Sequence, residues 1–176
     1  MHSINQENDF FLRPIERSDL SDIQRWRNCP STIPNVREYR IMSMDHISAW
    51  YDSMILSDKF EMFIMDSKKD GTIGVCGLTY IDWKNKHADL HFAIYKESQW
   101  IDDIYSNIYY PMIVEYAFNH LNLNKVYVEV YDIDEKKKNF FLEKGFKADA
   151  CLREHYYYDG KYWNSYIFSL LKSEVM

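Results

Sequence analysis

The chain lacks several features that would assign it to common classes of protein. Its three cysteines, Cys29, Cys76 and Cys151, lie far apart and form no C-x-x-C pair, so neither a disulfide framework nor a structural zinc site is indicated. No apolar run approaches the roughly 18 residues that a membrane helix needs. Residues 1–9 are polar and include no apolar signal-peptide core. We therefore expect a cytoplasmic protein that binds no membrane and has a flexible segment at residues 1–9.

An excess of positive charge is also missing. The 176 residues include 27 acidic and 21 basic side chains, which gives a formal net charge of −6. Proteins that bind nucleic acids normally present a basic face, so the composition argues against a nucleic-acid partner. It agrees with a cationic or amine ligand, although most acidic surfaces only confer solubility.

Composition and hydrophobic periodicity indicate one mixed α/β domain that spans residues 1–176. Apolar residues make up 47% and charged residues 27% of the chain, as in globular proteins. Apolar residues at three- and four-residue steps predict helices, and alternating ones predict strands. The expected helices follow Ser18, begin at Ser43, and span about 105–121 and 134–144. The expected strands span about 10–15, 60–65, 72–83, 88–95, 125–131, 148–157 and 162–171.

Short motifs follow one another along nearly the whole chain in an order known from one protein family. They are Leu12-Arg13-Pro14-Ile15, Arg25-Trp26-Arg27-Asn28, Ile73-Gly74-Val75-Cys76-Gly77-Leu78, Asn124-Lys125-Val126, Glu143-Lys144-Gly145-Phe146 and Leu152-Arg153-Glu154-His155-Tyr156. In these motifs the chain resembles the GNAT N-acetyltransferases, especially the ribosomal-protein alanine, spermidine and nucleotide-aminosugar branch. The resemblance implies the GNAT fold, of α/β (α+β) class. Its central sheet is mixed, mostly antiparallel and twisted, with about seven strands and four or so flanking helices.

The resemblance also implies an N-acetyltransferase in which an amine attacks the thioester of acetyl-CoA directly, without a metal. The acceptor would be an aminosugar nucleotide, a polyamine or a protein N-terminus. In the family the coenzyme lies between two splayed strands, here 88–95 and 125–131, and its pyrophosphate binds a glycine-rich turn at a helix N-terminus. The resemblance implies that the coenzyme is bound by Phe92, Ala93, Ile94, Trp100, Ile101, Asp102, Asp103, Ile104, Tyr105, Asp134 and Lys137.

The coenzyme loop departs from the family pattern. Residues 99–105 contain no glycine, and Asp103 and Tyr105 stand where the two motif glycines are expected. Counting back from Gly145, Asp134 stands where the family has an asparagine. Phe141 stands where the family has the tyrosine that protonates the departing thiolate. The chain therefore resembles a family member whose coenzyme A loop is degenerate.

Three residues are candidates for proton transfer. Asp89 and His91 share one face of the strand that flanks the acetyl group in the family. A carboxylate, or an imidazole with a reference pKa of about 6.5, can accept the proton of the amine. Alternatively, both side chains face solvent or a hydrogen bond in the core. Tyr131 can replace the missing acid or simply pack against its neighbours. The candidates for the acceptor pocket are Arg27, Asn28, Tyr80 and Trp83.

The departures at the coenzyme loop leave two other hypotheses open. The chain can be a non-catalytic relative that binds a ligand or partner, or an acyltransferase whose donor is a carrier protein. Lys137 can supply charge to the phosphates, or the lysine run 136–138 can be a solvated helix face. Exposed strand edges and many tyrosines favour a homodimer.

Overall fold

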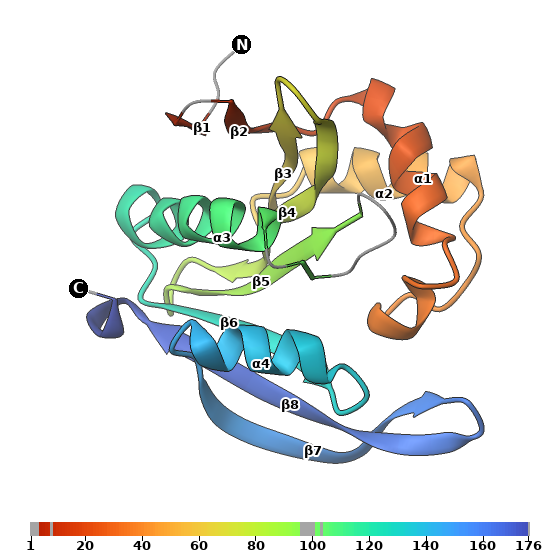
Figure 1. Cartoon of the computed structure of the whole chain (residues 1–176), viewed down its shortest axis with the longest axis vertical. Coiled ribbons are helices and arrows are strands. Elements are labelled where there is room, and N and C mark those ends of the chain that lie inside the picture. Colours follow the sequence, from red (N-terminus) through yellow and green to blue (C-terminus); the bar gives the residue numbers. More distant parts are fainter. Residues whose placement is uncertain (1–3, 8, 96–100, 103, 176) are drawn as a thin grey trace.

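The computed structural model describes residues 4–7, 9–95, 101–102 and 104–175. Among these residues, eight strands form one sheet in the order β1-β2-β3-β4-β5-β6-β8-β7 (Figure 1). All neighbours are antiparallel except β5 and β6, which are parallel. The strands are β1 (Ile4–Glu7), β2 (Phe10–Pro14), β3 (Glu61–Ser67), β4 (Gly71–Asp82), β5 (His87–Ile94), β6 (Lys125–Tyr131), β7 (Lys147–Tyr158) and β8 (Lys161–Leu171). The mixed, mostly antiparallel sheet of the GNAT fold is thus confirmed, with eight strands in place of about seven.

The additional strand lies within the segment that was expected to be flexible. Ile4–Glu7 pairs with β2, with Ile4 opposite Leu12 and Glu7 opposite Phe10. An edge strand presents unpaired backbone N–H and C=O groups, and a neighbouring polar segment can satisfy them without apolar side chains. The structure thus places a strand at residues 4–7, within the segment 1–9 for which we expect flexibility.

In the part of the chain that the structure describes, four α-helices flank the sheet, as expected. They are α1 (Leu20–Arg27), α2 (Met44–Ile55), α3 (Tyr105–Glu115) and α4 (Glu135–Glu143). The chain first turns through a 3-10 helix at Arg17–Asp19, so the helix expected after Ser18 begins at Leu20, with Asp19 as its N-cap residue. The expected helix over residues 105–121 is α3 followed by a π-helical segment, Tyr116–His120.

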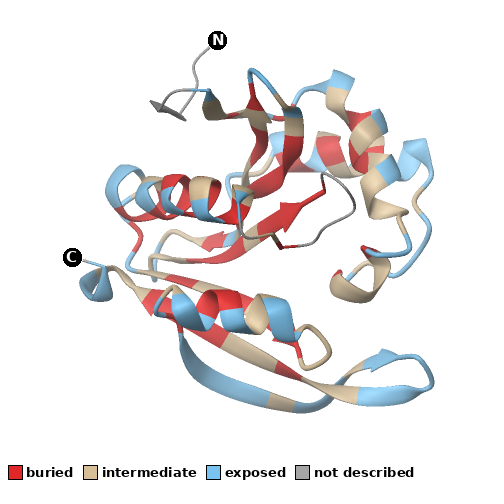
Figure 2. Ribbon diagram, in the orientation of Figure 1, coloured by how far each residue is buried: buried red, intermediate tan, exposed pale blue. Residues whose placement is uncertain are grey.

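The helices cover opposite faces of the central strands because side chains alternate along each strand. One face packs against α1 and α2 through Ile64, Val75, Ala93 and Tyr95. The other packs against α3 and α4 through Phe63, Cys76, Leu90, Phe92 and Ile94. Figure 2 shows buried residues along the middle strands and exposed ones along the outer strand β7. The side chains of Asp89 and His91 consequently belong to the α1–α2 face.

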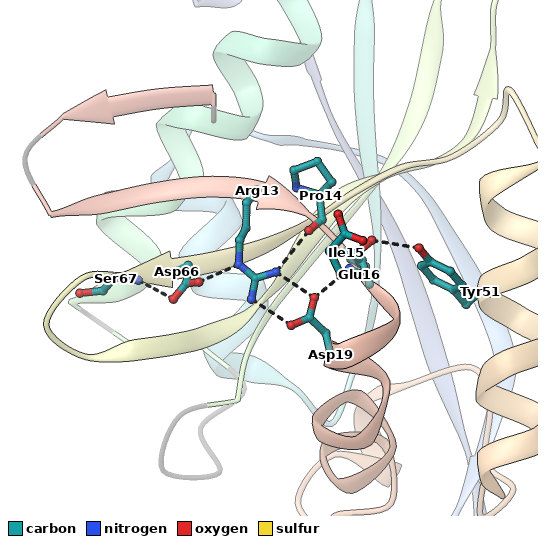
Figure 3. A network of polar contacts seen from close by, with 8 residues as sticks. All are labelled: Arg13, Pro14, Ile15, Glu16, Asp19, Tyr51, Asp66 and Ser67. Carbon is teal, nitrogen blue, oxygen red and sulfur yellow. Dashed lines mark hydrogen bonds and ion pairs between the residues drawn. The ribbon is translucent and has the colours of Figure 1, made fainter. Parts of the chain in front are cut away.

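An ion-pair network holds the start of α1 against the sheet (Figure 3). The Arg13 guanidinium donates to Asp19 at 2.8 and 2.9 Å and to Asp66 of β3 at 2.7 Å. Burial raises the pKa of Asp19, but hydrogen bonds from Arg13 and from the backbone N–H of Glu16 outweigh it, so the pKa lies below its ordinary value. The ionised carboxylate is thus the form that the fold stabilises. The network fixes the direction of α1, whose last residue is Arg27.

Strands β5 and β6 separate after three paired positions. Their register joins His87 to Lys125, Ala88 to Val126 and Asp89 to Tyr127, and no described pair follows. The N–H of Tyr95 donates to Ile73 on the β4 side. Since successive N–H groups of a strand alternate in direction, those of Phe92 and Ile94 point into the opening. The splayed strand pair that the sequence suggested is therefore present.

Candidate functional site

A cavity of about 580 Å³ lies on the α1–α2 face, beside the opening between β5 and β6. Its wall combines residues of α1, α2, β3, β4, β5, β6 and α4 with the loop that joins α1 to α2. Seven of the candidate residues line it: Arg27, Tyr80, Asp89, His91, Phe92, Tyr131 and Lys137. The fold thus brings all three candidates for proton transfer to one cavity.

The centre of the wall is an arginine bound to two carboxylates. Arg37 Nη1 lies 2.7 Å from Asp89 Oδ2, and Arg37 Nη2 lies 2.9 Å from Glu129 Oε2. The Ser165 hydroxyl donates to the other oxygen of Glu129 at 2.6 Å. The Asp89 side chain is only 9% exposed. Burial raises the pKa of Asp89 above its ordinary value, and the opposing charge and hydrogen bond of Arg37 only partly offset this.

His91 is neutral at physiological pH. Burial, together with the nearby charges of Arg27, Lys137 and Arg37, lowers its pKa to about 3. The ring therefore stays uncharged and is a weak acceptor of a further proton. Burial likewise lowers the pKa of Lys137, although the charges of nearby Asp134 and Asp89 oppose this.

Tyr131 stands at the end of β6 and is held by a second ring. It stacks on Tyr156 of β7 with ring centroids 3.8 Å apart and an interplanar angle of 1°. The Tyr156 hydroxyl donates to the Pro34 carbonyl at 2.8 Å, which ties β7 to the α1–α2 loop. Burial raises the pKa of Tyr131 to about 12. The phenol is therefore protonated at neutral pH and has a proton to donate.

The four candidates for the acceptor pocket separate into two pairs. Arg27 and Tyr80 line the cavity, whereas Asn28 and Trp83 do not. The Asn28 side chain donates to the Met42 carbonyl at 2.9 Å and accepts from the Met42 N–H at 2.8 Å, so it closes the loop between α1 and α2. Trp83 Nε1 donates to the Asp58 carbonyl at 2.8 Å. Asn28 and Trp83 thus shape the loops around the site.

Most of the other candidates for coenzyme binding have structural contacts. Asp134 caps α4 by accepting from the Lys137 N–H at 3.0 Å. Asp102 lies before the start of α3, and its carboxylate accepts from the N–H of Ser106 in the first turn at 3.0 Å. Tyr105 packs edge-on against Phe10. Ala93, Ile94 and Ile101 are buried in the core, Ile104 is exposed, and Trp100 and Asp103 lie outside the described residues.

Sequence reasoning missed four charged residues of the wall, namely Arg37, Glu38, Arg40 and Glu129. Glu129 could have been found, because it lies two residues before Tyr131 on the same strand and therefore on the same face. Arg37 gives no such signal, because it lies in a loop without periodicity. It reaches Glu129 across 92 positions of the chain.

Neither a metal cluster nor a membrane span is found in the described part of the chain. No group of three or more His, Cys, Asp and Glu side chains there could hold a metal ion. No helix within residues 4–7, 9–95, 101–102 and 104–175 is long and apolar enough to cross a membrane.

Comparison with known proteins agrees with this architecture. The model of the acetyltransferase (GNAT) domain matches residues 12–167. The chain is 24% identical to spermidine N(1)-acetyltransferase of Vibrio cholerae, over 94% of each chain. It is 26% identical to an uncharacterized N-acetyltransferase, p20, of Bacillus licheniformis, over 93% of each. A crystal structure of the Vibrio cholerae enzyme in complex with CoA and spermine superimposes with a TM-score of 0.86 at 24% identity, covering 94% of this chain and 97% of the other. The chain belongs to the acetyltransferase (GNAT) family.

Proposed function

We propose that the protein transfers the acetyl group of acetyl-CoA to a primary amine by direct attack. The observation that carries the proposal is the buried Asp89 carboxylate in a cavity beside the opening between β5 and β6. The opening presents the N–H groups of Phe92 and Ile94, which suit a thioester carbonyl. Family membership supports the same reaction.

Three parts of the chain have separate roles in the proposed reaction. Asp89 accepts the proton of the amine, directly or through water, because its raised pKa makes it a stronger base than an ordinary aspartate. The N–H groups of Phe92 and Ile94 stabilise the negative charge that develops on the carbonyl oxygen. Tyr131 is protonated at neutral pH and supplies a proton to the departing thiolate. No covalent enzyme intermediate is required.

A second candidate function is that of a GNAT-fold protein which binds a ligand without transferring an acyl group. One contact favours this second function: the Asp102 carboxylate already accepts a hydrogen bond from the Ser106 N–H at the start of α3. N–H groups at this end of a helix are those that a phosphate would use. A donor attached to a carrier protein would depend less on this turn.

Calorimetric titration with acetyl-CoA at low salt, together with an assay of thiol release, tests the proposal. Spermidine is the first acceptor to assay, because two of the curated relatives from Vibrio cholerae and Escherichia coli are named spermidine N(1)-acetyltransferases. We expect micromolar binding of the coenzyme and thiol release that depends on an amine. Absence of binding at millimolar acetyl-CoA would exclude it as the donor.

The variant Asp102→Asn tests whether the glycine-free turn before α3 lies beside the coenzyme phosphates. Asp102→Asn keeps an oxygen that can accept from Ser106 but removes the negative charge beside the expected phosphates. We expect it to bind acetyl-CoA more tightly than the native chain, because like charges at close range cost on the order of a few kcal/mol at an effective dielectric near 20. Equal affinity would show that the phosphates bind elsewhere.

We also propose that the protein assembles into a homo-oligomer. One structure of the Vibrio cholerae enzyme, with a TM-score of 0.82, is described as dodecameric. The outer strand β7 of this chain is largely exposed, and Tyr157 and Tyr162 present exposed rings at its hairpin with β8. Such a strand edge can pair with another copy. Light scattering of the purified protein should give a multiple of the 21.3 kDa chain mass, and the mass of a single chain would contradict this.

A further inference from the structure

Among the described residues, the wall of the cavity has more cations than anions, although the whole chain carries a net charge of −6. Four basic side chains line it, namely Arg27, Arg37, Arg40 and Lys137. The lining carboxylates are Glu38, Asp89 and Glu129. The local charge balance is thus the reverse of that of the chain.

Each of these three carboxylates is already bound to an arginine. Asp89 and Glu129 share Arg37, at 2.7 and 2.9 Å. Glu38 receives two hydrogen bonds from the Arg40 side chain, at 2.7 and 2.5 Å. A polyamine carries several positive charges and no negative one. To bind these carboxylates, it would have to displace the guanidinium groups from them, and its own charges would then be repelled by those nearby guanidinium groups. Charge repulsion of that kind is a common means of rejecting a ligand.

Arg27 stands apart from these pairs. It is the last residue of α1, and no salt bridge between described residues includes it. Its side chain reaches the Tyr95 hydroxyl on the cavity wall. The neighbouring His91 side chain is half-buried and uncharged, and the charges of Arg27, Arg37 and Lys137 act on it. Arg27 also acts on the charge of Glu38, but the Glu38 carboxylate is hydrogen-bonded to Arg40 and forms no salt bridge with Arg27, so an anion placed here would meet guanidinium donors of Arg27.

We propose that the acceptor is an amine that also carries an anionic group, and that Arg27 binds this group. A guanidinium binds both carboxylate and phosphate oxygens in paired hydrogen bonds, so the shared chemistry of the two groups is what the wall recognises. The amino group then lies toward Asp89, whose carboxylate accepts its proton. The inference rests on the proposed acetyl transfer and adds the class of acceptor to it.

Matched pairs of amines test the inference. Glucosamine 6-phosphate is compared with glucosamine, β-alanine with β-alaninamide, and spermidine is assayed alongside, with thiol release as the readout. We expect kcat/KM of the anionic member of at least one pair to exceed that of its neutral partner and of spermidine by about 10-fold or more. The pair that shows the larger ratio distinguishes phosphate from carboxylate. Spermidine as the best substrate of the five would overturn the inference.

Two variants separate a specific contact from general electrostatics. Arg27→Gln should raise the KM for the anionic acceptor about 10-fold, while leaving the KM for the neutral partner and for acetyl-CoA unchanged. The control is Arg25→Gln on the same helix, because Arg25 is exposed, pairs with Asp22 at 2.9 Å and does not line the cavity. It should leave every constant unchanged. A rise in the KM for acetyl-CoA in Arg27→Gln would assign Arg27 to the coenzyme and overturn the inference.

The two proposals fail in different ways. If no amine is acetylated by the native chain, acetyl transfer is rejected, and calorimetry with the same five compounds then decides the charge preference. Binding of an anionic amine that is weakened about 10-fold in Arg27→Gln would still support the contact. Binding of spermidine in preference to the anionic amines would overturn it.

Discussion

Asp89→Asn is expected to lower kcat by about 100- to 1,000-fold, because the variant keeps the size of the side chain and loses the group that accepts the proton. Glu129 remains to pair with Arg37, so the wall of the cavity keeps its shape. The pH profile should change as well. The native kcat falls as the pH drops through the raised pKa of Asp89, since a protonated carboxyl accepts no proton. The variant should lose this dependence. Steady-state kinetics from pH 5 to 9 measures both effects.

Two controls distinguish Asp89 from its neighbours. Glu129→Gln also removes a carboxylate from Arg37, but it keeps Asp89 and should lower kcat less than about 10-fold. His91→Gln should have a similarly small effect, because burial and nearby cations hold the pKa of the native ring near 3. A loss in His91→Gln as large as that in Asp89→Asn would assign the base to His91. Circular dichroism of each variant checks that the fold is retained.

Phe141→Ala is expected to lower the free energy of unfolding by about 3–5 kcal/mol. The ring is 0% exposed and packs against Phe140, Phe146 and Tyr110, with ring centroids 4.9–6.5 Å apart. Removing it deletes buried apolar surface and leaves a cavity under α4. Urea titration followed by tryptophan fluorescence measures the change. The control is Leu142→Ala at the next position, where the side chain is 43% exposed and the expected change is within about 0.5 kcal/mol.

The variant Phe141→Tyr tests whether the same position can take part in catalysis. The family resemblance assigns the thiolate acid to this place, yet the structure buries the ring in the core and leaves it out of the cavity lining. A hydroxyl added there should therefore lower stability by about 1–3 kcal/mol through desolvation and leave kcat unchanged. A gain in kcat of about 10-fold or more would show that the position does reach the departing thiolate, and that the native chain lost its acid through this substitution.

The helices and strands could be predicted because their signals are local. The alternation of residues 88–95 is sufficient to put Asp89 and His91 on one face, and the structure shows both in the cavity. The strand at residues 4–7 could not be predicted, because three of its four residues are polar and it pairs with β2 through the backbone. The roles expected for Asp102 and Asp134 followed from their positions in family motifs. In the structure, their carboxylates accept from backbone N–H groups at the starts of α3 and α4.

The sequence by itself determined the family, the order of the elements and the face on which the candidate base lies, since periodicity and short motifs are properties of neighbouring residues. Only the tertiary structure decided the charge of the site. Arg37 meets Asp89 and Glu129 because the Asn28 side chain closes the α1–α2 loop and Tyr156 holds it from β7. An arginine in an aperiodic loop is placed by such distant contacts, and no local pattern encodes which carboxylates it will meet. The overall charge of −6 therefore says little about the cavity, whose wall is set by which side chains the fold brings together.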